Sequence, residues 1–309
     1  MEMAKTAGIQ VLVMFILIGV GYFFAKKDWI SRQGSSEINK LLLYAVTPCL
    51  LISTYNRPFD RDLFEVLLKT FILAVISHFL AIIVSFIFIR GKEPRNKLER
   101  FAVMFSNGGF MGIPLVSALI GSDNIILASV YVMVFNLTQW TVGVLILTGR
   151  SSVKDTLKKI ILNPGVISIL IGQILFIFSI KLPSPVSTAI GFIANMNTPI
   201  AMILVGTYMA RTKILPYFAN PRVYYISFLR LIVIPLLMIP VYLVFPANNF
   251  STTANFVASA CPIAALAAMF PANYGYEPDY GTGAVTVSTI LSVITIPLVT
   301  LLFSKIMIM

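Results

Sequence analysis

Two apolar segments of the chain are interrupted by residue types that break helices. The first reads Phe105-Ser-Asn-Gly-Gly-Phe-Met-Gly-Ile-Pro114, and the second reads Ser259-Ala-Cys-Pro262. Lipid offers no hydrogen bonds to loose backbone, so a break at membrane depth survives only where it is buried in protein or lines a cavity. Proline lacks an N–H and fits the first turn of a helix. We therefore interpret Pro114 and Pro262 as the starts of two half-helices.

The chemistry expected of such paired breaks is the binding of a negatively charged group. If the breaks meet inside the membrane, two helix N-termini with free N–H groups face one small volume. Asn107 adds a polar side chain there, and Ser259 and Cys261 stand at the second break. Three glycines of the first break let backbones approach closely, namely Gly108, Gly109 and Gly112. The alternative is a pair of kinked packing helices, with Cys261 as a buried, reduced side chain.

Two ionisable residues lie within apolar segments and are candidates for a role in binding or coupling. Arg230 is the deepest formal charge of the chain and would attract a carboxylate. In the alternative interpretation, the Arg230 side chain extends along the helix so that its guanidinium reaches the nearer membrane surface. His78 is the only histidine and could carry a coupled proton, or it could be a hydrogen-bonded packing residue.

Asn136 and Ser292 are candidates for second contacts to a ligand. Amide and hydroxyl side chains inside a membrane also bond neighbouring helices without touching a ligand. Asn136 is the stronger candidate, because a buried amide must satisfy several hydrogen-bonding groups.

The composition places these residues in a membrane protein. Of the 309 residues, 58% are hydrophobic and only 11% are charged, whereas soluble domains average about 25% charged residues. The net charge of +11 does not indicate nucleic-acid binding, because the basic residues cluster between apolar runs. There is no metal-ligand spacing and no cofactor motif, so we expect no metal and no cofactor. A single histidine without a carboxylate pair leaves little to build an enzyme from.

Length and flanking charge predict an all-α polytopic protein of ten membrane spans, since about 20 apolar residues cross a bilayer. The spans are 8–25, 38–55, 64–89, 99–120, 124–148, 164–181, 186–210, 222–245, 251–272 and 281–307. Most lysines and arginines lie in or beside the connections that follow odd-numbered spans. This bias predicts a cytoplasmic side for those connections and an outer side for both termini.

The hydrophilic linker 149–163 divides the chain into five spans (1–148) and five spans (164–309). An odd number of spans per half forces the halves into opposite orientations, which makes an inverted repeat. Thr47-Pro48 in span two and Thr198-Pro199 in span seven support a duplication. Pro114 and Pro262 follow these motifs at nearly equal distances. Paired breaks in two related halves point to a transporter's substrate site.

Five segments make the chain resemble the auxin efflux carrier family, within the superfamily of bile acid and auxin carriers. They are Asn39-Lys-Leu-Leu-Leu-Tyr-Ala-Val-Thr-Pro48, Ser106-Asn-Gly-Gly-Phe-Met-Gly-Ile-Pro-Leu115, Thr198-Pro-Ile-Ala-Met-Ile-Leu-Val-Gly206, Cys261-Pro-Ile-Ala264 and Ser288-Thr-Ile-Leu-Ser-Val-Ile-Thr-Ile-Pro297. The bacterial members of that family include malate and malonate permeases. The resemblance implies a scaffold of spans one, two, six and seven, and a transport domain in which broken spans four and nine cross. It also implies a homodimer in the plasma membrane and a binding role for Asn107.

Together these observations predict a carrier of small organic anions, such as malate-like or auxin-like acids, that works by alternating access. One alternative is sodium-coupled symport of an organic anion. A second alternative is a membrane sensor that binds a ligand in the same fold without moving it.

Overall fold

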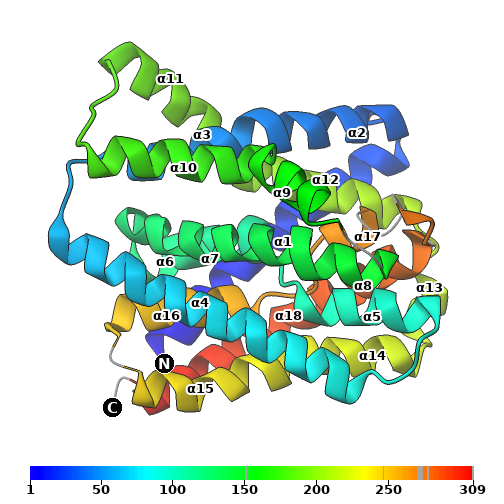
Figure 1. The fold of residues 1–309 in the computed structure, drawn as a ribbon. Coiled ribbons are helices and arrows are strands. Elements are labelled where there is room, and N and C mark those ends of the chain that lie inside the picture. Colours follow the sequence, from blue (N-terminus) through cyan, green and yellow to red (C-terminus); the bar gives the residue numbers. More distant parts are fainter. Residues whose placement is uncertain (150–151, 246, 270–273, 277, 308–309) are drawn as a thin grey trace.

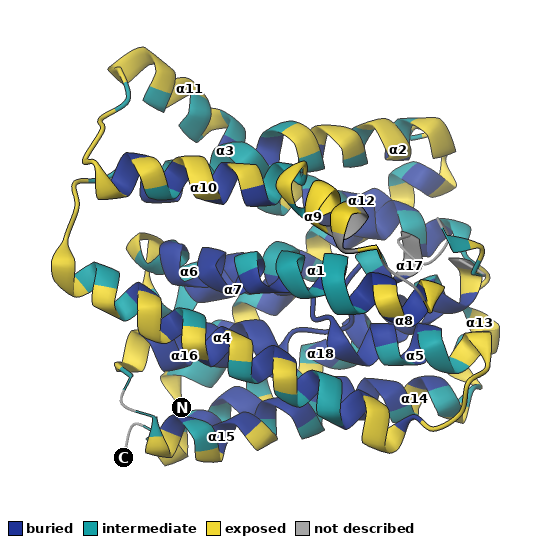
Figure 2. Ribbon diagram, in the orientation of Figure 1, coloured by how far each residue is buried: buried dark blue, intermediate teal, exposed yellow. Residues whose placement is uncertain are grey.

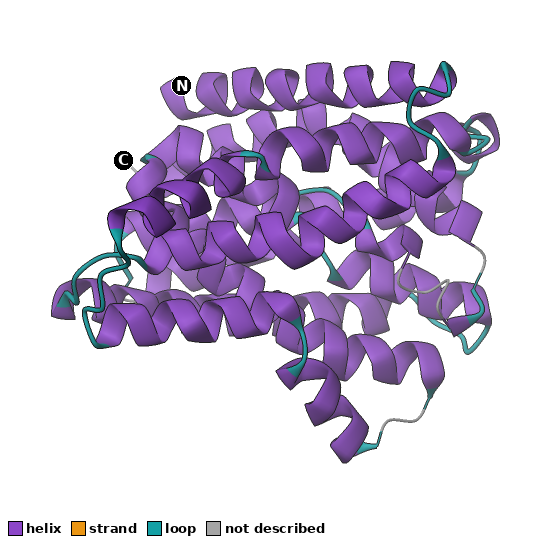
Figure 3. Cartoon of the chain, turned by 90° about the horizontal axis from the view of Figure 1, so that it is seen from above, coloured by secondary structure: helices purple, strands orange, loops and turns teal. Residues whose placement is uncertain are grey.

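The structure is a computed structural model that describes residues 1–149, 152–245, 247–269, 274–276 and 278–307. Within these residues the regular structure is helical, and a single isolated β-bridge is the only strand-like feature. Short loops join the helices (Figure 3). Residues 270–272 of the predicted span 251–272 lie outside the described residues.

The first half of the chain contains two uninterrupted long helices and several helices with a π-helical turn. Its elements are α1 (Glu2–Lys26), α2 (Arg32–Leu41), η1 (Leu42–Val46), α3 (Thr47–Tyr55), α4 (Arg61–Phe88), α5 (Pro94–Met104), η2 (Gly108–Gly112), α6 (Ile113–Ile120), η3 (Ser122–Asn124), α7 (Ile125–Thr138), η4 (Gln139–Gly143), α8 (Val144–Thr148) and the linker helix α9 (Val153–Ile161). The π-turns η1, η2 and η4 continue directly into the α-helices that follow them.

The second half begins at α10 and ends with the longest helix. Its elements are α10 (Pro164–Ile177), α11 (Ser184–Asn195), α12 (Asn197–Arg211), α13 (Leu215–Phe218), α14 (Pro221–Phe228), η5 (Leu229–Val233), α15 (Ile234–Val244), α16 (Asn249–Ala260), α17 (Leu266–Met269) and α18 (Pro278–Met307). Polar side chains start several of these helices. Asn163 and Asn248, for example, accept hydrogen bonds from backbone N–H groups in the first turns of α10 and α16.

Seven helical stretches of the described residues are long and apolar enough to cross a membrane. Shorter apolar helices cover Gly108–Ile120 and Pro164–Ile177. The start of α1 and the end of α18 lie at the same end of the bundle (Figure 1), an arrangement compatible with an even number of crossings such as the ten predicted. The chain is therefore a multi-pass membrane protein, whereas the ten-span count, the inverted repeat and the sidedness of the termini stay predictions.

Proline explains three of the π-turns. Pro48, Pro114 and Pro235 each lie two residues after the last residue of η1, η2 and η5, respectively. A proline nitrogen has no hydrogen to give to the carbonyl four residues earlier, so the helix widens locally and takes up an extra residue.

Helices α1 and α12 pack with their backbones almost in contact. A Cβ atom on Gly21 would lie 2.0 Å from the carbonyl oxygen of Ile203, and one on Gly206 would lie 2.0 Å from that of Ile18. Only glycine permits this separation, because any side chain would overlap the facing backbone.

The most buried helices lie in the interior of the bundle, and exposed residues lie on the outer helices α2, α10 and α11 (Figure 2). Every residue from Ser251 to Ala260 of α16 is buried. Several of them are polar, including Asn255 and Ser259. Because polar groups are costly inside a membrane, they mark α16 as a helix that faces protein and not lipid.

A buried ionic cluster ties α5 to α14 and α18. The Glu99 side chain is fully buried, and its Oε2 lies 2.7 Å from Nη2 of Arg222. Its Oε1 accepts a hydrogen bond from the Tyr280 hydroxyl at 2.8 Å and lies 3.4 Å from Nε of Arg95. Two cations and a hydroxyl thus compensate the burial of this carboxylate. Glu99 was not predicted from the sequence to have such a role.

Candidate functional site

The two predicted interruptions are present, and they meet. Residues 105–107 separate α5 from η2, and residues 261–265 separate α16 from α17. Ser106 and Ile263 form an antiparallel β-bridge. The N–H of Asn107 donates to the Pro262 carbonyl at 2.7 Å, and the N–H of Ala264 donates to the Phe105 carbonyl at 2.9 Å. Each break thereby satisfies backbone groups of the other, which is what a membrane interior requires.

The interpretation of the two prolines as helix starts is wrong. The helix after the first break begins at Gly108, and Pro114 lies six residues later, past the π-turn η2. Pro262 lies inside the second break, and α17 begins only at Leu266 with four residues. The physical reason at Pro114 is that its missing N–H widens the helix without ending it. Among the described residues, only the N-terminus at Gly108 therefore belongs to a helix of substantial length.

Arg230 connects the two broken helices. Its side chain is fully buried, so it does not snorkel. Nη1 donates to the carbonyls of Val103 and Met104 at 3.1 and 3.3 Å, and Nη2 donates to the carbonyl of Ser259. These carbonyls end α5 and α16, where helix dipoles place partial negative charge. One guanidinium thus caps both helices where they stop at the crossing.

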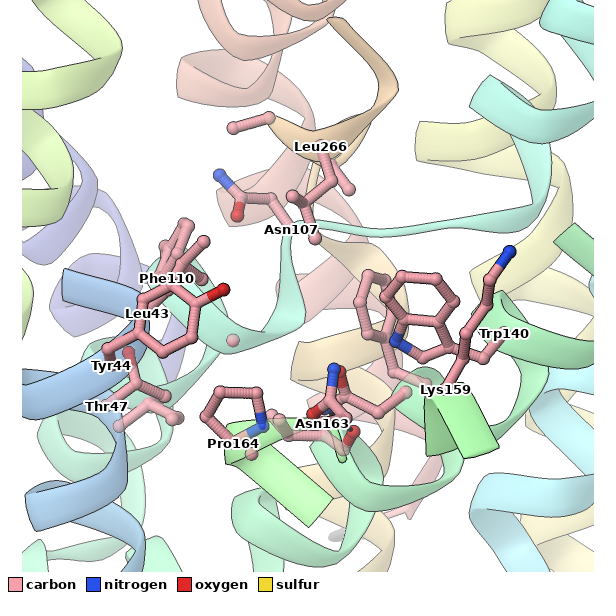
Figure 4. A pocket seen from close by; sticks show the side chains of 18 of the residues that line it. Leu43, Tyr44, Thr47, Asn107, Phe110, Trp140, Lys159, Asn163, Pro164 and Leu266 are labelled. Carbon is pink, nitrogen blue, oxygen red and sulfur yellow. Dashed lines mark hydrogen bonds between the residues drawn. The ribbon is translucent and has the colours of Figure 1, made fainter. Parts of the chain in front are cut away.

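A cavity of about 710 Å³ lies beside the crossing. One wall comes from η1, α3 and the start of α10, and the opposite wall comes from Ser106, Asn107, η2 and α7. The linker helix α9 closes one end with Lys158 and Lys159. Figure 4 shows Asn107 and Leu266 on one side of this space and Asn163 and Pro164 opposite them. The cavity thus lies between elements of both halves of the chain.

The polar groups of the cavity suit an anion. Asn107 is 4% exposed, and its Nδ2 has no hydrogen-bond partner among the described residues. Its side chain does not cap the helix, so it leaves uncapped N–H groups in the first turn from Gly108. The only charged side chains among the described lining residues are Lys158 and Lys159. Donors and positive charge therefore line this space, and none of the described lining residues is a carboxylate.

The remaining lining of the cavity is largely apolar and aromatic. It includes Leu43, Phe110, Ile113, Val132, Phe135 and Trp140. Pockets for organic ligands combine such walls with a few polar groups. The arrangement can hold a small organic anion.

Three of the predicted site residues line the cavity, namely Asn107, Gly109 and Asn136. The Asn136 side chain also donates to the Val132 carbonyl at 2.9 Å. The other residues predicted at the breaks lie in the packing behind the cavity: Gly108, Gly112, Pro114, Ser259, Cys261 and Pro262.

Gly112 and Cys261 show what these packed residues do. A Cβ atom on Gly112 would lie 3.3 Å from Cα of Ala258 and 3.5 Å from the Cys261 sulfur. The glycine therefore lets η2 approach α16 closely where the broken helices cross.

His78 and Ser292 do not line the cavity. Nδ1 of His78 lies 2.8 Å from the Ala74 carbonyl, and its ring centroid lies 4.7 Å from that of Tyr131. The Ser292 hydroxyl donates to the Thr289 carbonyl at 2.6 Å. Tyr131 links His78 to the crossing, because its hydroxyl lies 3.0 Å from that of Ser106.

The lysines of α9 were not predicted from the sequence to be cavity residues. In the sequence, Lys158 and Lys159 contributed only to the charge bias that predicts which side of the membrane each connection faces. The available signal was their position shortly before Asn163-Pro164, which starts α10 beside the cavity. The described residues contain no group of three or more His, Cys, Asp or Glu side chains that could hold a metal ion.

Comparisons with known proteins agree with a transport role. A family model described as membrane transport protein matches residues 6–156 and 148–300. An uncharacterized transporter of Methanothermobacter thermautotrophicus is 23% identical over 296 residues, which cover 93% of this chain and 95% of that protein. The uncharacterized transporter YfdV of Escherichia coli K12 is 21% identical over 302 residues, covering 94% and 95%.

Proposed function

Because the chain belongs to the membrane transport protein family, the auxin efflux carrier family that its motifs resemble, we propose that it is a secondary carrier of small organic anions. The observation that carries this proposal is the composition of the cavity beside the crossing. Two lysines and Nδ2 of Asn107, which has no partner among the described residues, line it, and no described lining residue is acidic. An organic carboxylate matches both these groups and the apolar walls.

Asn107 is the residue proposed to hold the carboxylate. Its Nδ2 is a donor without a partner among the described residues, and the helix that starts at Gly108 adds first-turn N–H groups and the positive end of its dipole. Arg230 would act on the anion indirectly, because its guanidinium donates to helix carbonyls. It holds the breaks together and adds positive potential.

Alternating access is the proposed mechanism. The helices that meet at the crossing, α5, α6 and α16, would move with their neighbours against α3 and α10 and carry the anion with them. The cavity between these two groups of helices would then be open to one side of the membrane at a time. We propose the plasma membrane as the location of the protein, with both termini outside.

The test is uptake of radiolabelled mono- and dicarboxylates into liposomes that contain the purified protein. Asn107→Ala removes the free donor, and a hydrogen bond to a charged group contributes about 1.5–3 kcal/mol. We expect uptake to fall by about ten- to hundredfold, while melting temperature and elution profile stay unchanged. Asn195→Ala is the matched control, because Asn195 is exposed on α11 and does not line the cavity. Normal uptake by a folded Asn107→Ala protein would refute the site.

The same preparation separates the proposed carrier from its alternatives. Uptake that requires a sodium gradient would favour sodium-coupled symport. The Arg230 guanidinium already occupies carbonyls at the crossing that could otherwise bind a cation, which argues against that alternative. Ligand-induced stabilisation without any flux would favour a sensor.

A further inference from the structure

The connection between α1 and α2 folds back onto the end of α1. Asp28 has a φ of 56°, the left-handed conformation that reverses the chain after a helix. The N–H of Trp29 then donates to the Phe24 carbonyl at 3.0 Å. The Trp29 ring packs edge-on against those of Phe23 and Phe24, with centroids 5.7 and 5.2 Å apart. These contacts hold the connection in one conformation.

Trp29 is at the same time open to the surroundings of the protein. It is 67% exposed and follows directly on α1, a helix long and apolar enough to cross a membrane. Phe23 beside it is 48% exposed. Tryptophan at the end of a membrane span lies at the level of the lipid headgroups, because its ring is apolar and its N–H is polar. The turn therefore presents an aromatic surface at the boundary between headgroups and acyl chains.

Three exposed cations belong to the same turn, namely Lys26, Lys27 and Arg32. Nζ of Lys27 lies 5.8 Å from the ring centroid of Phe23, a cation–π contact that positions the ammonium without neutralising its charge. None of the three cations forms an ion pair with a described carboxylate. Asp28 is the one acidic residue between them. The turn thus carries a net positive charge at the membrane surface.

Helix α12 ends beside this turn and adds further positive charge. The Arg211 guanidinium donates to the Ile30 carbonyl, which lies 181 positions earlier in the chain. Lys213 follows two residues after Arg211 and is exposed. The charge bias of the sequence predicts that both connections face the cytoplasm. Two segments far apart in the chain therefore bring their basic residues to one membrane surface.

We propose that the turn of Lys26, Lys27, Trp29 and Arg32 binds the headgroup of an anionic phospholipid. The three cations attract the phosphate, and the rings of Trp29 and Phe23 contact the glycerol backbone and the start of the acyl chains. A free phosphate ion would gain nothing from the aromatic rings, so the surface fits a lipid. The site is separate from the cavity and does not depend on which solute the protein carries.

The test titrates dioctanoyl phosphatidylglycerol and dioctanoyl phosphatidylcholine into the purified full chain in a nonionic detergent. The rise in melting temperature with lipid concentration gives the Kd of each lipid. We expect the wild type to bind phosphatidylglycerol about tenfold more tightly or better. Joint replacement by Lys26→Gln and Lys27→Gln should raise the Kd of phosphatidylglycerol about ten- to thirtyfold, since each lysine contributes about fivefold, or about 1 kcal/mol. The Kd of the zwitterionic lipid should stay within about twofold, and added salt should weaken phosphatidylglycerol binding mainly in the wild type.

Joint replacement by Lys5→Gln and Lys305→Gln is the matched control. Both lysines are exposed, and they lie near the start of α1 and the end of α18, at the other end of the bundle. This control removes the same two charges and should leave phosphatidylglycerol binding unchanged. Joint replacement by Lys26→Arg and Lys27→Arg keeps both charges and should retain the preference for phosphatidylglycerol. It also shows that the two positions tolerate substitution in a folded protein.

Equal affinity of the wild type for the two lipids would overturn the proposal. So would a protein with glutamine at positions 26 and 27 that keeps the preference for phosphatidylglycerol. An equal loss in the matched control would mean that net charge alone attracts the lipid, and it would overturn the site as well. If glycerol 3-phosphate stabilises the wild type as strongly as phosphatidylglycerol at the same concentration, the surface binds phosphate and not lipid. None of these results bears on the proposed transport, because no solute is present in the assay.

Discussion

Replacing Arg230 with leucine tests whether one guanidinium holds the crossing together. The side chain is fully buried and donates to three backbone carbonyls, those of Val103, Met104 and Ser259. These carbonyls are among the last groups of α5 and α16, so no helical N–H can replace the lost donors. Leucine fills part of the volume and supplies no hydrogen bond.

The magnitude follows from the groups left without partners. Each buried acceptor that loses its donor costs about 1–3 kcal/mol, which gives about 3–9 kcal/mol for the three carbonyls. The substitution also recovers the several kcal/mol that burying a charge costs. We therefore expect a net loss of about 3–5 kcal/mol, in the lower part of the range for the three carbonyls. Such a loss is large against a total stability of about 5–15 kcal/mol.

Thermal unfolding in detergent micelles, followed by size-exclusion elution, measures the effect. At about 2–4 °C per kcal/mol for a large domain, Arg230→Leu should melt about 10 °C below the wild type. Arg230→Lys keeps a charge and three donors on a more compact group, so its loss should be intermediate. Arg61→Leu is the control, because the Arg61 side chain is 86% exposed and its ion pair with Glu65 spans 3.7 Å. Exposed pairs contribute about 0–1 kcal/mol.

An Arg230→Leu protein that melts within about 2 °C of the Arg61→Leu control, a shift worth no more than about 1 kcal/mol, would refute this reasoning. The carbonyls of α5 and α16 would then have found other donors. If that stable protein also lost transport, Arg230 would act on the solute and not on the helix ends.

Two further substitutions test contacts that the fold depends on. Glu99→Gln removes the carboxylate between Arg95 and Arg222, whose side chains are 50% and 37% exposed and stay partly hydrated. The melting temperature should fall by an amount equivalent to about 1–3 kcal/mol. An unchanged value would mean that the cluster adds nothing net. Gly21→Ala places a Cβ atom 2.0 Å from the Ile203 carbonyl and should reduce the yield of monodisperse protein, whereas Gly19→Ala, with nothing within 4 Å of its Cβ position, should not.

The interruptions could be predicted because they are local. The first break lies at residues 105–107, directly before Gly108 and Gly109, and glycines weaken an α-helix whatever surrounds them. The membrane then restricts where such a segment can lie, since loose backbone in lipid has no hydrogen-bond partner. From these two rules followed the membrane class, the broken helices and their meeting. These rules did not predict where the helix begins again. It begins six residues before Pro114, and the proline only widens it.

The candidate site was predicted in part. Asn107 was found because a polar side chain beside a helix break is costly in an apolar segment unless it faces protein or a ligand. Ser292 was chosen on residue type alone, and the structure gives its hydroxyl a partner one turn away within α18. A hydroxyl in a membrane helix can bond its own backbone as readily as a ligand, and no sequence pattern separates the two.

By itself the sequence determined that the chain lies in a membrane, that two of its helices break, and that their breaks carry groups suited to an anion. Only the tertiary structure decided which residues far apart in the chain lie together. Arg230 reaches carbonyls 126 and 127 positions away in the chain, Glu99 pairs with Arg222, and Lys159 lies at the cavity beside Trp140. The spacing of residues along a helix fixes which side chains share a face, but the partners across a cavity depend on how separate helices pack.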